Sequence, residues 1–218
     1  MSEPVAVDRR TLAQGQSVKT EGWPRTLRRQ ARIRGVLSRR QPDLTVVLEN
    51  IHDPHNVSAI LRSCDAVGVL RAHAVYTVEE PPPGVFARQT SASAAKWVDV
   101  ERHVSAAACF EILRGHGFQI LVTSLDLGSR SLYEWDLGTP TALVLGNEMR
   151  GVSSEASALA DGAIAIPMMG MVQSLNVSVA GAVCLFEAFR QRWEAGVYEA
   201  SKLDDAALSA MEEDWLRR

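Results

Sequence analysis

The sequence predicts an α/β domain with a mostly parallel sheet that is flanked by helices. Short apolar, β-branched runs such as 44–48 (LTVVL) and 141–145 (TALVL) are bounded by turn residues, as buried strands are. Longer segments with apolar residues at helical spacing separate these runs. Strands that alternate with helices form parallel sheets. A chain of 218 residues is long enough for one sizeable core.

The first 43 residues differ from the rest of the chain in charge. They carry ten basic and four acidic side chains, a balance of +6, whereas the whole chain has a net charge of −3. Residues 1–23 show little periodicity and are predicted to be mobile. In 24–40, arginines alternate with apolar residues, which predicts an amphipathic helix. A basic face suits an anionic polymer, because phosphate contacts release counterions; a solvated arginine-rich helix is the alternative.

The remaining elements follow from local signals. After the strand 44–48, Asn56 is placed to cap a helix that runs to about Val67. Ser174 or Asn176 is the expected cap of a long helix that begins with small residues and ends near 195. Further strands are predicted at 72–78, 96–100, 119–124 and 163–166, and further helices at 105–114, 153–159 and 204–218.

Three loops at the expected carboxyl ends of strands are polar or rich in glycine. They follow Leu48, Leu145 and Ile166, and ligands of parallel sheets bind at such ends. The GxGxxG pattern of dinucleotide-binding enzymes is absent after the first strand, so a dehydrogenase is the weakest interpretation.

Cysteine and histidine usage points away from metal chemistry. The three cysteines are scattered and form no CxxC pair, which argues against a zinc cluster or a disulfide framework and favours a reducing, cytoplasmic setting. His52 and His55 flank Pro54 but lack a third ligand at suitable spacing, so no metal is expected. No apolar run reaches membrane length.

Three segments together carry a specific resemblance. They are 50–69 (NIHDPHNVSAILRSCDAVGV), 143–153 (LVLGNEMRGVS) and 166–192 (IPMMGMVQSLNVSVAGAVCLFEAFRQR). In order and separation they resemble the SPOUT superfamily of RNA methyltransferases, in its TrmH branch, over about 33–198. The resemblance implies a C-terminal trefoil knot, a rare exception to unthreaded chain topology. It also implies S-adenosyl-L-methionine as methyl donor and a homodimer with the active site at the interface.

The resemblance further implies 2′-O-methylation of the D-loop guanosine of tRNA. The run MVQSLNVSVA and the segment RRQPDLTVVLE favour this substrate over ribosomal RNA. Methylation of ribosomal RNA and a knotted RNA-binding protein without activity are the alternatives. The expected organisation is a basic RNA-contacting extension (1–43), a methyltransferase domain (44–198) and a C-terminal helix (199–218).

The family pattern assigns roles to residues of this chain. Arg62 is the expected principal catalytic residue; since arginine is hard to deprotonate, we expect it to bind the adjacent phosphate and stabilise the developing oxyanion. Without the resemblance, Arg62 reads as a surface arginine and Glu148 as a partner of Arg150. The other expected catalytic residues are Asn56, Glu148, Ser174 and Asn176. The expected cofactor contacts are Thr123, Ser124, Leu125, Gly146, Asn147, Ile166, Met168, Met171, Ser174, Leu175 and Asn176, and the expected RNA contacts are Arg28, Arg29, Arg32, Arg39 and Arg40.

Overall fold

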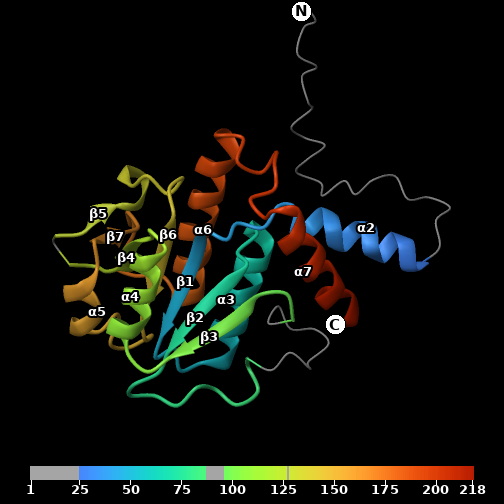
Figure 1. The fold of residues 1–218 in the computed structure, drawn as a ribbon. Helices are drawn as coiled ribbons and strands as arrows, with labels where there is room; N and C mark the ends of the chain where they lie inside the picture. Colours follow the sequence, from blue (N-terminus) through green and yellow to red (C-terminus); the bar gives the residue numbers. More distant parts are fainter. Residues whose placement is uncertain (1–24, 87–95, 127) are drawn as a thin grey trace, which may run out of the picture.

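The computed structural model describes residues 25–86, 96–126 and 128–218, so the prediction for 1–23 lies outside the described residues. Its centre is a seven-stranded sheet in the order β3-β2-β1-β6-β4-β7-β5, and every described strand pair is parallel (Figure 1). The strands are β1 (Leu44–Glu49), β2 (Arg71–Val75), β3 (Asp99–His103), β4 (Gln119–Thr123), β5 (Arg130–Ser131), β6 (Thr141–Leu145) and β7 (Gly162–Ala165). The predicted α/β class with a parallel sheet is confirmed.

Helices cover both faces of the sheet. On one face, α3 (Pro54–Val67) and α6 (Val177–Glu194) bury Ile60 and Leu185 against Leu48 and Leu145. On the other face, α4 (Ala106–Gly115) and α5 (Ser154–Leu159) form a second core that includes Phe110. Strands covered on both sides need apolar residues on both faces, which explains why β1 and β6 are buried throughout. None of the described helices is long and apolar enough to cross a membrane.

The helices at the two ends of the described chain pack on each other. The first, α2 (Arg25–Leu37), lies beside the last, α7 (Asp205–Arg217), at one end of the molecule (Figure 1). Ile33 and Leu37 of α2 share a small core with Leu208 and Trp215 of α7. The apolar side of the C-terminal helix is therefore a packing surface.

Several predicted boundaries are wrong in a physically informative way. The cap of α3 is Asp53, whose carboxylate accepts a hydrogen bond from the His55 amide at 2.8 Å, so Asn56 lies inside the helix. Pro54 suits the first position because the amide there needs no helical partner. The strand predicted at 96–100 lies three residues later, as β3. The short β5 and the 3₁₀ helix η2 (Leu132–Glu134) were not predicted.

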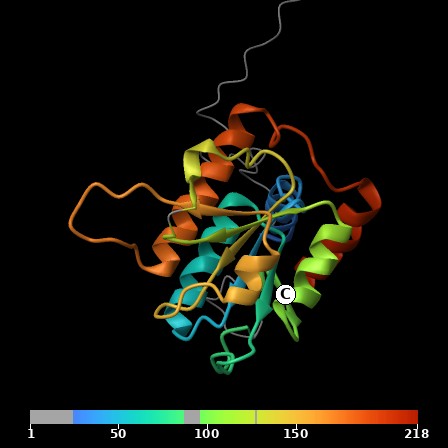
Figure 2. The ribbon, with the colours of Figure 1, turned by 90° about the vertical axis from the view of Figure 1, so that its left-hand side faces the viewer.

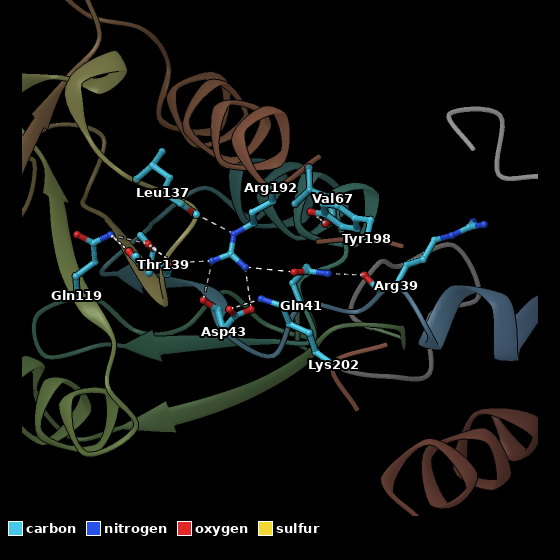
Figure 3. A network of polar contacts seen from close by, with 12 residues as sticks. Arg39, Gln41, Asp43, Val67, Gln119, Leu137, Thr139, Arg192, Tyr198 and Lys202 are labelled. Carbon is cyan, nitrogen blue, oxygen red and sulfur yellow. Dashed lines mark hydrogen bonds and ion pairs between the residues drawn. The ribbon is translucent and has the colours of Figure 1, made fainter. Parts of the chain in front are cut away.

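The buried side chain of Arg192, near the end of α6, binds residues from distant parts of the chain (Figure 3). Arg192 is 0% exposed, and its guanidinium donates to the Asp43 carboxylate at 2.8 Å and to the backbone oxygens of Leu137 and Thr139 at 3.0 and 2.7 Å. Lys202 also binds Asp43. Burial raises the pKa of Asp43, but the hydrogen bonds and charges of Lys202 and Arg192 outweigh it and leave this pKa below its ordinary value.

Candidate active site

A cavity of about 630 Å³ opens at the carboxyl ends of β4, β6 and β7, where the sequence places two of the three polar loops. The loops after these three strands and the start of α6 form its walls. In Figure 2 the chain between β7 and α6 swings away from the body as an open loop, drawn in orange. The lining residues are Thr123, Ser124, Leu125, Asp126, Gly146, Asn147, Glu148, Met149, Arg150, Gly151, Val152, Ser157, Ile164, Ile166, Met168, Gln173, Ser174, Leu175, Asn176, Val177 and Ala180.

The loop after β6 is a tight turn that only glycine permits at both ends. The amides of Asn147 and Gly151 donate to each other's carbonyls at 2.9 and 2.8 Å. A Cβ on Gly146 would lie 2.2 Å from the carbonyl carbon of Gly151, and Gly151 itself has a φ of +69°. The buried Asn147 side chain donates to the Asn50 carbonyl at 2.8 Å and so anchors the loop to the end of β1.

Three of the predicted catalytic residues form one hydrogen-bonded network. The amide nitrogen of Asn56 donates to the Glu148 carboxylate at 2.9 Å, and the amide nitrogen of Asn176 donates to the Asn56 side-chain oxygen at 3.1 Å. The backbone amides of His52 and Asp53 also donate to Glu148, at 3.1 and 3.2 Å. The network joins the loops after β1 and β6 to the start of α6.

Glu148 is the anionic centre of this network. Partial burial raises its pKa, but hydrogen bonds from Asn56 and from backbone amides outweigh this effect and hold the pKa below its ordinary value of 4.5. The network is therefore complete above that ordinary value and is lost only as the pH falls through the lowered pKa. The alternative pairing of Glu148 with Arg150 does not occur, because Arg150 binds Glu79 at 2.5 Å.

Asn176 has a second role as the N-cap of α6. Its side-chain oxygen accepts from the Ser178 amide at 2.8 Å, which decides between the two caps that the sequence allowed. Ser174 lies exposed on the loop and lines the cavity. The cap fixes the rotamer of Asn176, and the same side chain then holds Asn56 in place.

Arg62 stands apart from the other predicted catalytic residues. Its side chain is exposed on α3, does not line the cavity, and forms no hydrogen bond or ion pair with the described part of the chain. Asn56 points into the protein from the same helix and is 8% exposed. One copy of the chain therefore does not bring Arg62 into the cavity.

The predicted cofactor positions lie around the cavity with one exception. Met171 is fully exposed and lies outside the lining, because the loop carries it away from the body. Two polar residues that line the cavity, Asp126 and Gln173, were not predicted from the sequence. Asp126 accepts a hydrogen bond from the Ser124 hydroxyl at 2.8 Å. Gln173 belongs to the polar cluster before α6, so its position was visible in the sequence, whereas Asp126 had no comparable signal.

The five arginines that are predicted to contact RNA differ in their exposure to solvent. Arg28, Arg29 and Arg32 are exposed on α2, and Arg39 is half-buried beyond it. For Arg40 the prediction is wrong. Its side chain is 1% exposed, donates to the Val69 carbonyl at 2.8 Å, pairs with Asp65 and stacks over Trp215 of α7.

Comparison with known proteins gives a consistent picture. The SpoU rRNA Methylase family matches residues 43–186. The tRNA (guanosine(18)-2′-O)-methyltransferase of Thermus thermophilus is 54% identical over 195 residues, which cover 89% of this chain and 98% of that enzyme. The A. aeolicus TrmH/SpoU tRNA modifying enzyme is similar in structure, with a TM-score of 0.78, 39% identity and coverage of 88% and 96% of the two chains. An AdoMet-bound rRNA methyltransferase from Sinorhizobium meliloti has a TM-score of 0.60 and 28% identity, with coverage of 72% and 59%.

Proposed function

This chain belongs to the SpoU rRNA Methylase family, and on that premise we propose that it is a tRNA (guanosine(18)-2′-O)-methyltransferase that uses S-adenosyl-L-methionine. The observation that carries the proposal is the 54% identity with an enzyme of that name across nearly the whole length of both chains. The likeness to the ribosomal-RNA enzyme is weaker and spans only 59% of its chain.

The cavity offers both apolar surface and polar groups to a ligand. Its volume lies within the range of small-molecule sites, about 300 to 1,000 Å³. Leu125, Ile166 and Leu175 supply apolar surface, and the tight loop 146–151 presents backbone groups. When bound, S-adenosyl-L-methionine supplies a methyl group that its sulfonium already activates.

The residues of this chain would position the ribose and stabilise charge. Asn56 and Asn176, held by each other and by Glu148, form a rigid polar edge next to the cavity. Glu148 already accepts from three groups, so we assign it a positioning role. Arg62 would bind the neighbouring phosphate and stabilise negative charge on the 2′-oxygen as its proton leaves.

We propose that the chain is a homodimer in which Arg62 of one protomer reaches the cavity of its partner. Large apolar side chains are exposed near the cavity and on α6: Met149 is 92%, Met169 95% and Phe186 50% exposed. Exposed apolar surface of this kind marks interaction sites. A second copy of the chain would cover this apolar surface. Its Arg62 would then lie at the cavity, where a single copy does not place it.

We also propose that the loops near Gly146 and Met168, together with the entry to α6 at 174–176, form a C-terminal trefoil knot. The loops after β6 and β7 line the same cavity, and β4 lies between β6 and β7, so the chain must pass β4 to connect them.

Residues 44–198 would be the methyltransferase domain. Residues 1–43 would be the basic RNA-contacting extension and 199–218 the C-terminal helix, whose α7 packs on α2. A tRNA enzyme of this kind would work in the cytoplasm.

The test is methyl transfer from labelled S-adenosyl-L-methionine to an unmodified tRNA transcript, followed by mapping of the product. We expect one 2′-O-methyl group per tRNA, on guanosine 18. Methyl transfer to a ribosomal RNA fragment but not to tRNA would show that ribosomal RNA is the substrate and would contradict the proposal. Absence of both transfer and cofactor binding would instead support an RNA-binding protein without activity.

Replacing Arg28, Arg29 and Arg32 together with alanine should weaken tRNA binding and make it less sensitive to salt. Each exposed arginine that contacts phosphate contributes about 1 to the slope of log K against log salt, so the slope should fall by up to about 3. Filter binding over a salt series measures it. The matched control replaces Arg71, Arg114 and Arg130, which are exposed on other elements. Equal slopes for the two triple variants would contradict α2 as the RNA-binding face.

A further inference from the structure

Two histidines and a cysteine meet at the edge of the sheet that lies away from the cavity. His73 comes from β2, His103 from β3 and Cys109 from α4. One ring nitrogen of each histidine and the Cys109 sulfur all lie within 4.8 Å of one another. These are two imidazoles and one thiol, the ligand types that zinc and similar ions prefer.

The fold places these groups together by register and capping. In the parallel pairing of β2 and β3, His73 lies opposite Glu101 and Val75 lies opposite His103. His73, Glu101 and His103 therefore share the face that α4 covers, because side chains alternate along a strand. Ser105 caps α4 directly after β3, and Cys109 follows in its first turns, facing the sheet.

The cluster is largely shielded from solvent. His73 is 5% and Cys109 0% exposed, while His103 lies half-buried at the edge. His73 Nδ1 and His103 Nε2 are 2.8 Å apart, which is a hydrogen bond in the metal-free protein.

We propose that His73, His103 and Cys109 form a structural site for a thiophilic divalent transition metal of the zinc type. Tetrahedral zinc, with Zn–N near 2.0–2.1 Å and Zn–S near 2.3 Å, requires about 3.3 Å between two nitrogens and about 3.6 Å between nitrogen and sulfur. The two histidine nitrogens need to separate by only about 0.5 Å. The thiol would lose its proton to solvent as the metal binds.

The fourth ligand would be water or the Glu101 carboxylate. Glu101 lies opposite His73 on the same face and currently pairs with Arg71 at 3.0 Å. The site would join β2, β3 and α4, and it would take no part in methyl transfer because β1 separates β2 from β6, the nearest strand that borders the cavity. A sequence search misses it, since its ligands have no motif spacing and only the fold brings them together.

Cobalt titration of the chelator-treated full-length protein tests the site. We expect one equivalent of Co²⁺ to bind, with a thiolate-to-cobalt charge-transfer band and the visible absorption of tetrahedral cobalt, and Zn²⁺ to displace it. Cys109→Ser should lose the charge-transfer band. His103→Gln, at a half-buried edge position, should fold and bind Co²⁺ at least about tenfold more weakly, since it loses one of three protein ligands.

The matched control is Cys184→Ala, which removes another buried free thiol and should keep both signals. Zn²⁺ should also raise the Tm of the wild-type protein, with a smaller shift in His103→Gln. A wild-type protein without the charge-transfer band would overturn the proposal. A charge-transfer band that persists in Cys109→Ser, or an unchanged Co²⁺ affinity in His103→Gln, would also overturn it. The three side chains would then serve only as a hydrogen-bonded part of the core.

Discussion

Replacing Arg62 with alanine should reduce methyl transfer to tRNA by about 100-fold or more. Removing one group that stabilises a developing oxyanion costs about 10²–10³ in rate. Arg62 is exposed and has no partner within the described part of the chain, so its loss should change the free energy of unfolding by less than about 0.5 kcal/mol. Single-turnover methyl transfer, together with thermal unfolding, separates the two effects.

Two further measurements sharpen this prediction. Arg62→Lys keeps the charge but not the planar fork of donors, so its rate should lie between those of the wild type and the alanine variant. Cofactor affinity should change little, because the proposed contacts of Arg62 are the RNA phosphate and the 2′-oxygen and not the cofactor. If Arg62→Ala and the wild type methylate tRNA equally fast, the proposed catalytic role is refuted.

Replacing Arg192 with methionine should lower the free energy of unfolding by about 3–5 kcal/mol. Methionine fills much of the space, but the carbonyls of Leu137 and Thr139 lose their donor and Asp43 keeps only Lys202 as a charged partner. Removing a fully buried partner of an ion pair that also donates to backbone oxygens carries a cost of this size. Urea unfolding at neutral pH measures it.

Arg190 provides the control on the same helix. It pairs with Glu187 and Glu194, but its side chain is 52% exposed, so Arg190→Met should destabilise the protein much less than Arg192→Met does. The difference in the free energy of unfolding between the wild type and Arg192→Met should also become smaller in acid. Asp43 has a lowered pKa, so its contribution is complete above its ordinary value of 3.8 and is lost as the pH falls through the lowered one. Equal losses for Arg190→Met and Arg192→Met would contradict this account.

Local signals predicted the elements whose residues decide their own structure. The apolar runs of β1 and β6 are buried on both faces, and Ser105, Ser153 and Asp204 cap helices where the sequence placed helix starts. The sequence could not rank Asp53 above Asn56 as a cap, since both side chains suit that position. The two-residue β5 carries no periodicity at all.

Contacts between distant segments were beyond local reasoning. The family pattern named Asn56 and Glu148 together, but only the fold shows that they hydrogen-bond across 92 positions of sequence. Arg40 matched the basic pattern of its neighbours, yet it is buried because α7 and the end of α3 enclose it. Helical periodicity describes one element, whereas burial depends on what packs against that element.

The pairing of α2 with α7 has a consequence for the newly made protein. The apolar side of the basic helix, with Ile33 and Leu37, packs on side chains that are translated much later, Leu208 and Trp215 among them. During translation this side stays uncovered until α7 has left the ribosome. The basic helix would thus reach its final packing only after the segments of the sheet that lie between the two helices in sequence have been made.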